Sequence, residues 1–236
     1  MLAALEAALG ARGLDVTWPL DAAAFDGACA PVAPALRLAA LLPGGRAALV
    51  VASGRAFFDA FARARDPADT APNPLDRHAR AVVVEAARAA LDPLGVAHAE
   101  LFPFLGGDGG VVIPFQRLGR AAGLAASSPL GLQIHPTYGA WWAYRALVVV
   151  DVDLPPGAPL SDGCAGCPAP CVAACPASAV QRAGFSIPAC HARRLTAEPC
   201  HLSCAARIAC IRGPEHRYSD EQLAFHMRAS MPRRRD

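Results

Sequence analysis

Residues 164–176 read CAGCPAPCVAACP, a stretch that places four cysteines within twelve residues and closes on a proline. Four more cysteines follow at positions 190, 200, 204 and 210, whereas the first 160 residues contain only Cys29. This shift in composition predicts a cysteine-rich module joined to a larger domain. The turn-rich segment 155–157, Pro-Pro-Gly, is the expected boundary between them.

The spacing of these cysteines is close to that of a ferredoxin. The first group reads C-x2-C-x3-C-x3-C-P, with one residue more between Cys167 and Cys171 than the bacterial pattern C-x2-C-x2-C-x3-C-P. In that pattern the cysteine before the proline ligates the neighbouring cluster, and two four-iron clusters require eight thiolates. The predicted ligand sets are Cys164, Cys167, Cys171 and Cys210 for one [4Fe–4S] cluster, and Cys175, Cys190, Cys200 and Cys204 for the other.

Other uses of the cysteines stay open at this level. Zinc sites are usually built from paired C-x2-C motifs, and only one strict C-x2-C occurs here. Disulfides are typical of secreted proteins, but the chain opens on an amphipathic helix rather than a signal peptide. Purely structural thiols are a third alternative. The second group, C-x9-C-x3-C-x5-C, is looser than a ferredoxin repeat, so the pattern predicts one cluster or two.

Composition and charge narrow the class of protein. A chain of 236 residues is long enough to bury a core without cross-links. Its net charge of +2 is too small to indicate nucleic-acid binding. Glu6 interrupts the N-terminal apolar segment, and no apolar run reaches the roughly 18 residues of a membrane helix. We therefore expect a cytoplasmic protein with reduced thiols that binds neither nucleic acid nor membrane.

Hydrophobic periodicity predicts the elements of an α+β fold. Short apolar runs indicate strands at 47–52, 131–135 and 146–154. Helical spacing of apolar residues and a capping box at Ser219 indicate helices at 55–65, 77–91, 114–126 and 220–229. The expected domains are an α+β core at 1–155, a cysteine module at 156–212, and a C-terminal helix and tail at 213–236 that return to the core.

Two stretches outside the cysteines resemble the CblC-type cobalamin-processing proteins. Residues 134–145, IHPTYGAWWAYR, resemble the segment IHP-x-(F/Y)-G-x-W-F-A-x-R of that family. Residues 215–222, EHRYSDEQ, resemble its E-R-Y-S-E-E-Q segment, with His216 as an additional residue. The order of elements between 42 and 91 is also similar. The resemblance covers most of the chain outside 156–212, and it implies a cobalamin-binding α+β domain with the cysteine module as an insertion.

The remaining motifs resemble epoxyqueuosine reductases and reductive dehalogenases, in which a two-cluster ferredoxin module follows a cobalamin-binding α+β domain. Similar segments are 113–115 (IPF), 122–124 (AGL), 135–139, 175–180 (CPASAV) and 190–196. The chain is shorter than those enzymes, and Cys210 is followed by isoleucine where they have CP. Their glycine-lysine-asparagine sequence is replaced by ASSP at 126–129. The resemblance therefore implies a nitroreductase-like or CblC-like sheet with a ferredoxin-like lobe. The departures weaken the case for epoxide or halide chemistry more than the case for this fold.

The CblC-type resemblance also implies a corrinoid pocket. The histidine that resembles His135 lies at the cobalamin pocket of that family, and the alternative is a strand-end histidine bonded to backbone. The aromatic residues of the segment suit either a pocket face or an ordinary core. The expected cofactor-binding residues are His135, Tyr138, Gly139, Trp141, Trp142, Tyr144, Arg145 and Arg217.

Two arginines and an aspartate are further candidates. Arg145 and Arg217 match arginines of the CblC-like segments, and their guanidinium forks suit carboxylate or phosphate groups, although surface arginines are common. Asp76 begins the triplet Asp76-Arg77-His78, which resembles the D-Y-H triplet of epoxyqueuosine reductases, whose aspartate is a proton donor. Asp76 is therefore the candidate catalytic residue, and a helix N-cap is its alternative role.

These resemblances imply an iron–sulfur, cobalamin-dependent reductase. It would reduce a bound corrinoid to cob(I)alamin and remove an upper ligand or reduce a small substrate, because iron–sulfur potentials extend to very low values. The implied partners are a redox donor such as flavodoxin or ferredoxin, and a small-molecule substrate or the upper ligand of the corrinoid. The alternatives are a cobalamin carrier and a ferredoxin-like electron-transfer protein without corrinoid.

Overall fold

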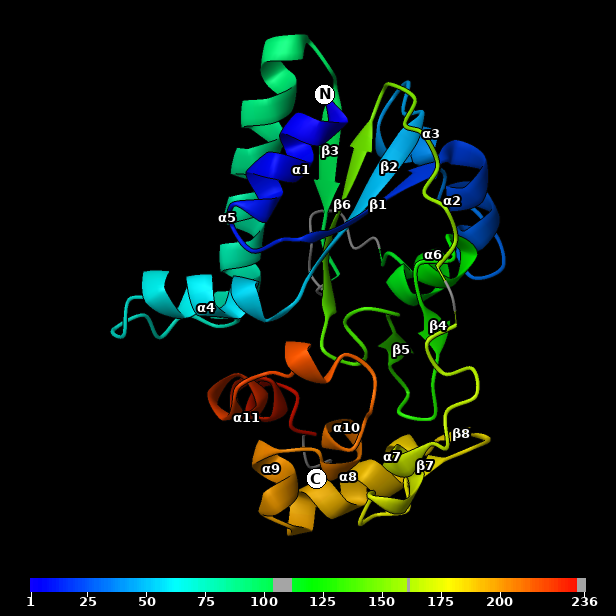
Figure 1. Cartoon of the computed structure of the whole chain (residues 1–236). Helices are drawn as coiled ribbons and strands as arrows, with labels where there is room; N and C mark the ends of the chain where they lie inside the picture. The colour runs from blue at the N-terminus through cyan, green and yellow to red at the C-terminus, as the bar shows by residue number, and fades with distance from the viewer. Residues whose placement is uncertain (104–111, 161, 233–236) are drawn as a thin grey trace. The chain divides into compact units, whose positions relative to one another are not determined.

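The apolar run at 47–52 is the second strand of a four-stranded antiparallel sheet (Figure 1). The computed structural model describes residues 1–103, 112–160 and 162–232. The strands are β1 (Val16–Asp21), β2 (Ala47–Ser53), β6 (Ala143–Val150) and β3 (His98–Leu101), and they lie in that order across the sheet. All seven residues of β2 are buried, as expected for an inner strand covered on both faces.

Helices lie on both sides of this sheet (Figure 1). On one side, α1 (Leu2–Gly10) packs along α5 (Pro74–Leu91), and α5 contacts β6 and β3. On the other side, α2 (Ala22–Cys29) packs against α6 (Phe115–Ala121). The remaining helices of this unit are α3 (Leu38–Leu41), α4 (Arg55–Ala64) and the 3₁₀ turn η1 (Asp92–Leu94).

Two local features explain where the observed elements differ from the predicted ones. Strand β1 was not predicted; it contains Pro19, which has no amide hydrogen for a ladder, but β1 is an edge strand and tolerates the loss. Helix α6 ends at Ala121 rather than at 126, because Gly123 adopts a φ of 66°. The Leu124 N–H then donates to the Gly119 carbonyl at 2.9 Å, which closes the helix in a Schellman motif.

A β-bulge interrupts the pairing of β2 with β6. Val51 pairs with Ala146, but the next residue, Ala52, pairs with Tyr144, so Arg145 is the extra residue on β6. A bulge changes the direction of the side chain it contains. Arg145 is accordingly buried, with 6% of its surface exposed.

The cysteine-rich part forms a unit of short elements. Its strands are β4 (Ala126–Ser127) with β5 (Gln133–Ile134), and β7 (Val180–Gln181) with β8 (Gly184–Phe185). Its helices are α7 (Pro170–Ala173), α8 (Ile187–Thr196), α9 (Pro199–Leu202), α10 (Ala205–Ile208), the 3₁₀ turn η2 (Pro214–His216) and α11 (Asp220–Ala229). Helix α11 begins at the predicted capping box, where the Ser219 hydroxyl accepts a hydrogen bond from the Gln222 N–H.

The boundary between the units differs from the predicted domains in two respects. The first unit comprises Met1–Leu124 and Trp142–Pro159, and the second comprises Ala125–Trp141 and Leu160–Asp236. Residues 125–141, predicted within the core, therefore belong to the cysteine-rich unit. Helix α11 belongs to the cysteine-rich unit as well, because it contacts α9. The guanidinium of Arg194 on α8 also donates hydrogen bonds to the carbonyl oxygens of Met227 in α11 and of Ser230 directly after it. Residues 233–236 of the predicted tail lie outside the described residues.

None of the helices in the described part of the chain combines the length and the hydropathy needed to cross a membrane.

Candidate functional site

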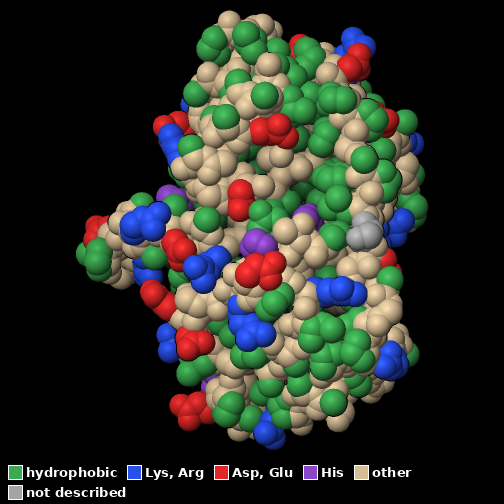
Figure 2. All heavy atoms as spheres, in the orientation of Figure 1, with side chains coloured by type: hydrophobic (Ala, Val, Ile, Leu, Met, Phe, Trp, Pro, Cys, Tyr) green, Lys and Arg blue, Asp and Glu red, His purple; other side chains and the backbone are tan. Residues whose placement is uncertain are grey.

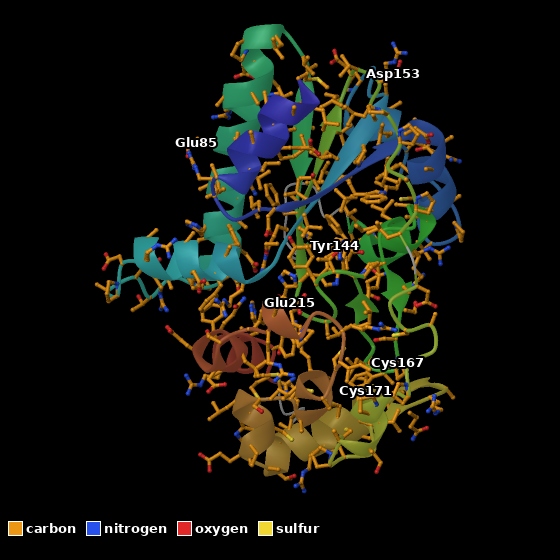
Figure 3. All side chains as sticks on the ribbon, in the orientation of Figure 1. Glu85, Tyr144, Asp153, Cys167, Cys171 and Glu215 are labelled. Atoms are coloured by element: carbon orange, nitrogen blue, oxygen red, sulfur yellow. The ribbon has the colours of Figure 1, made fainter. Side chains whose placement is uncertain are left out.

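Four cysteines of the second unit line one cavity of about 110 Å³. Cys164 and Cys167 lie in the segment that leads into α7, Cys171 lies in α7 itself, and Cys210 follows α10. Figure 3 shows Cys167 and Cys171 near one another. Two chain segments about 40 residues apart thus bring four thiols to one cavity, and they are the four residues predicted as the first ligand set.

Two thiols of this first set, Cys164 and Cys171, have a raised pKa that favours the protonated form. Burial, together with Asp162 and the other three cysteines, raises the pKa of Cys164 to about 11. Burial also raises the pKa of Cys171, and Cys210 and Cys167 add to the shift. A metal or cluster bound by thiolates must displace these protons, so its affinity depends on pH.

The remaining cysteines of the unit form a second group. Burial raises the pKa of Cys190, Arg194 opposes the shift, and the thiols of Cys204, Cys175 and Cys200 add to it. These four interacting residues are the second predicted ligand set. Cys190 lies on α8 and Cys200 on α9; Cys175 follows α7, and Cys204 is the N-cap residue of α10.

All nine cysteines are free thiols, so none is used in a disulfide. Within residues 1–103, 112–160 and 162–232, no three His, Cys, Asp or Glu side chains stand close enough to hold a single metal ion.

Two arginines that sequence reasoning did not single out also line the cavity. The Arg182 Nη2 donates to the Pro168 carbonyl at 2.8 Å, and the Arg212 Nη2 donates to the Ala165 carbonyl at 3.1 Å. Both bonds anchor the cysteine loop by its main chain. Over the elements of this unit, Figure 2 shows hydrophobic side chains gathered on one face, with arginines at its edge. In the sequence, the only indication that Arg212 lies at this cavity is its position two residues after Cys210.

His135 sits in a tight loop at the end of β5. Its Nδ1 accepts hydrogen bonds from the N–H groups of Thr137 and Tyr138, at 3.1 and 3.2 Å. The proton of the neutral ring is therefore on Nε2. Burial, with a smaller effect of His216, lowers the pKa of His135 to about 4. At neutral pH this side chain is an uncharged hydrogen-bond donor, and the protonated Nε2 does not offer a lone pair to a metal.

The loop of His135 crosses the segment that follows Cys210. His135 and Gly139 exchange main-chain hydrogen bonds of 3.0 and 2.8 Å. Gly139 has a φ of 56°, and a Cβ there would lie 1.9 Å from the Arg212 carbonyl oxygen. Gly213, with a φ of 58°, would place a Cβ 2.5 Å from the Thr137 carbonyl oxygen. Each of the two segments therefore contributes a glycine, Gly139 from the His135 loop and Gly213 from the segment after Cys210, and their main chains come into contact there. We call this contact the glycine crossing.

Two other predicted residues of this unit, Tyr138 and Trp141, pack against rings of the segment that follows Gly213. The ring of Tyr138 is 5.1 Å from His135 and 4.4 Å from His216, the residue that is additional to the CblC-like motif. Trp141 is fully buried and packs edge-on against Tyr218 at 5.5 Å. This packing favours the core interpretation of Trp141.

Arg217 and Arg207 both contact Trp141. Arg217 is exposed, donates to the Ile208 carbonyl at 2.7 Å and lies 5.8 Å from the Trp141 ring. Arg207, which was not predicted, donates to the Ala140 carbonyl and lies 4.9 Å from the same ring. These cation–π contacts give both arginines a structural role.

In the first unit, the bulge residue Arg145 gathers a separate group of side chains. Its Nε donates to the buried Ser53 hydroxyl at 2.9 Å, and its guanidinium lies 5.3 Å from the Phe57 ring. Arg145 also interacts with Asp76. Burial raises the pKa of Asp76, and the positive charge of Arg145 partly opposes that shift.

Asp76 lies in the first turn of α5, and Asn73 occupies the N-cap position. The alternative role of Asp76 as the helix cap is therefore wrong. The helix begins at Pro74, three residues before the predicted start.

Trp142 and Tyr144 pack together in the first unit. Their rings are 4.7 Å apart, and Phe115 lies 5.5 Å from Tyr144. Burial raises the pKa of the Tyr144 phenol, with a small opposing effect of Arg120. The phenol therefore stays protonated throughout the physiological range. The boundary between the units falls between Trp141 and Trp142, so the aromatic run is shared between them.

No protein-family model and no curated protein sequence matches the chain. Solved structures resemble it in fold. A selenomethionine-labelled epoxyqueuosine reductase superimposes with a TM-score of 0.59 and 14% identity, over 93% of this chain and 69% of that one. The epoxyqueuosine reductase of Streptococcus thermophilus gives 0.59 and 12%, over 90% and 66%.

A second kind of protein shares the fold over nearly its full length. The B12-trafficking protein CblC of C. elegans, a human MMACHC homologue, superimposes with a TM-score of 0.63 and 16% identity. The match covers 98% of this chain and 92% of that one. At identities this low, the superpositions establish only the fold. It is an antiparallel sheet with packed helices, of the kind found in both groups of proteins.

Proposed function

We propose that this protein is an iron–sulfur oxidoreductase that reduces a bound corrinoid. The observation that carries the proposal is the cavity of the second unit, where four free thiols converge from two chain segments. The fold supports it, because it is shared with a reductase and with a B12-trafficking protein. The epoxide chemistry of the epoxyqueuosine reductases is not part of the proposal.

The donor set suits iron–sulfur clusters better than zinc. Eight thiols fall into two groups of four, and only one strict C-x2-C, the usual form of a zinc ligand pair, occurs among them. In this proposal Cys164, Cys167, Cys171 and Cys210 hold one [4Fe–4S] cluster, and Cys175, Cys190, Cys200 and Cys204 hold a second. Such clusters supply one-electron transfer at low potential when bound.

The other residues of the second unit would position and shield these ligands. Arg182 and Arg212 place positive charge beside four thiolates and tie down the loop that carries them. His135 would meet the corrinoid as a neutral hydrogen-bond donor, because its Nδ1 is already occupied by main-chain N–H groups. Tyr138, Gly139, Trp141 and Arg217 would then shape the loop around it.

In the first unit, the proposal assigns proton delivery to Asp76. Its raised pKa favours the protonated carboxyl, and Arg145 lies near enough to stabilise the carboxylate that a proton transfer leaves behind. Trp142 and Tyr144 would contribute apolar surface. The electrons would come from a separate donor such as flavodoxin or ferredoxin, and the upper ligand of the corrinoid or a small molecule would be the second substrate.

The test is anaerobic reconstitution with iron and sulfide, followed by metal analysis, a visible spectrum and a cobalamin titration. We expect iron, no zinc, and reductive turnover of cyano- and methylcobalamin. Cys171→Ser should lose iron, whereas Cys29→Ala, at a buried thiol of the first unit, should retain it. Zinc in place of iron, or iron retained by Cys171→Ser, would refute the cluster assignment.

A cobalamin carrier is the second candidate, favoured by the 92% coverage of the CblC structure. A carrier would bind cobalamin and leave its upper ligand intact under reducing conditions. Iron without cobalamin binding would instead identify an electron-transfer protein.

A further inference from the structure

The loop between Cys167 and Cys171 contains an unusual main-chain conformation. Its three residues, Pro168-Ala169-Pro170, are one more than the ferredoxin spacing allows. Ala169 has φ of 58° and ψ of 55°, the left-handed region that non-glycine residues rarely occupy. This conformation is unfavourable for an L-residue, because its Cβ approaches the following carbonyl oxygen. Strain of this kind persists only where the surroundings enforce it, and it concentrates at functional sites.

The strained residue directs its amide hydrogen to a cluster ligand. The Ala169 N–H donates to the Cys167 Sγ at an N···S distance of 3.4 Å. Ala169 and Pro170 line the same cavity as the thiols. The Ala169 side chain packs against the small core that includes Leu130 and Ile134.

The loop is braced from outside the cysteine motif. Arg182, in the turn between β7 and β8, donates from its Nη2 to the Pro168 carbonyl at 2.8 Å. The brace, the flanking prolines and the core contact together hold Ala169 in place. Ser178, near the motif, is also left-handed, but its N–H donates to the Cys175 carbonyl oxygen, as in an ordinary turn. The Ala169 N–H instead donates to a cysteine sulfur.

We propose that Ala169 is a positioning residue whose N–H raises the reduction potential of the cluster held by Cys164, Cys167, Cys171 and Cys210. The inference rests on the proposed function, since it requires that cluster. When a cluster accepts one electron from its donor, its negative charge grows by one. A hydrogen bond to a ligand sulfur stabilises the more negative state more strongly. The inserted residue would thus make this cluster easier to reduce than it would be without the hydrogen bond.

The test is a redox titration, followed by EPR, of the full-length protein with both clusters reconstituted and dithionite as reductant. Deletion of Ala169 restores the ferredoxin spacing and removes the donor. We expect one of the two midpoint potentials to move to a lower value while the other stays constant. Ala169→Gly is the matched control: it keeps the N–H and adopts the left-handed region without strain, so both potentials should stay at their wild-type values. Unchanged potentials in the deletion, or an equal shift in Ala169→Gly, would overturn the inference.

A second measurement covers the case in which the deletion variant fails to assemble. Resonance Raman spectra of the wild-type protein in H₂O and D₂O should show a deuterium-sensitive Fe–S(Cys) band, which Ala169→Gly retains. The absence of any such band would also overturn the inference. Iron content separates the two levels of failure: a wild-type protein without iron refutes the proposed function as well, whereas full iron content with unaltered potentials refutes only the role of Ala169.

Discussion

His135 is buried with only 6% of its surface exposed, and its ring is neutral because two N–H groups already point at Nδ1. Protonation would place a second hydrogen against these donors and bring a charge into a desolvated loop. Both effects act in the same direction as the lowered pKa, about 4 against an ordinary value of 6.5.

The stability of the second unit should therefore fall on acidification. A histidine with a depressed folded-state pKa contributes stability that is complete above pH 6.5 and is lost as the pH drops to about 4. Each pKa unit corresponds to about 1.36 kcal/mol, so the loss approaches about 3 kcal/mol. In His135→Asn, chemical unfolding at a series of pH values should show a much smaller loss. His191→Asn, at an exposed position of the same unit, should follow the wild type. An unaltered pH profile in His135→Asn would contradict the buried neutral ring.

Asp76 shows the opposite behaviour. Burial raises its pKa above the ordinary 3.8, so its carboxylate form is disfavoured in the folded state. The stability that this group contributes is complete at low pH and is lost as the pH rises through the raised folded-state pKa.

At pH 7, Asp76→Asn should therefore increase the free energy of unfolding, and the gain should shrink as the pH falls toward about 4, the ordinary range of an aspartate pKa. Denaturant unfolding at the two pH values measures it. Asp59→Asn, at a half-exposed ion pair with Arg55, should change stability by less than about 1 kcal/mol at either pH. A loss of stability in Asp76→Asn at pH 7 would show that Arg145 outweighs the burial.

At the scale of elements, the crossing of Gly139 and Gly213 joins the His135 loop to the segment after Cys210. A side chain at Gly139 would meet the Arg212 carbonyl at 1.9 Å in addition to the cost of a positive φ. Gly166, in the cysteine loop, has a comparable φ of 66°, but a Cβ there would meet no atom of the described residues within 4 Å. Comparing substitutions at Gly139 and Gly166 therefore distinguishes the cost of steric overlap from the cost of a positive φ.

We expect Gly139→Ala to destabilise the second unit by more than about 3 kcal/mol, because either the loop or the Arg212 segment must move. Gly166→Ala should cost only about 1 kcal/mol, the contribution of the left-handed conformation alone. Thermal unfolding with hydrogen exchange at residues 133–139 measures both. Equal losses in the two variants would show that the crossing is less tight than the main-chain contact indicates.

At the scale of the whole molecule, the two units differ in what stabilises them. The first has a buried sheet with helices on both faces. The second consists of strands of two residues and mostly short helices, and its small core of Leu130, Ile134, Val180 and neighbouring residues is bordered by cysteines. Metal binding is therefore expected to supply a large share of its folding free energy.

Removal of iron by an anaerobic chelator should accordingly affect one unit only. Hydrogen–deuterium exchange should lose protection at 164–175 and 187–210 while the amides of β2 and β6 keep theirs. Reconstitution should restore the protection. Loss of protection in β2 on iron removal would contradict the independence of the two cores.

Much of this architecture was predictable from local pattern. The strand at 47–52, the helices at 55–65 and 77–91, and the capping-box helix at 220–229 were confirmed within a few residues, because their periodicity and caps are encoded locally. Strands β1 and β3 were not predicted. Pro19 weakens the signal of β1, and β3 has only four residues, all half-buried.

The sequence by itself determined that eight cysteines belong to one module and that the spacing of the first four differs by one residue from the ferredoxin pattern. Spacing carries this information because neighbouring ligands of one cluster lie close along the chain. The grouping of Cys210 with Cys164, Cys167 and Cys171 was also predicted, and the cavity brings these four together. The tertiary structure alone decided two other long-range approaches: the His135 loop with the Arg212 segment, and Arg145 with Asp76. These approaches depend on a glycine crossing and on a β-bulge, neither of which has a local signature in the sequence.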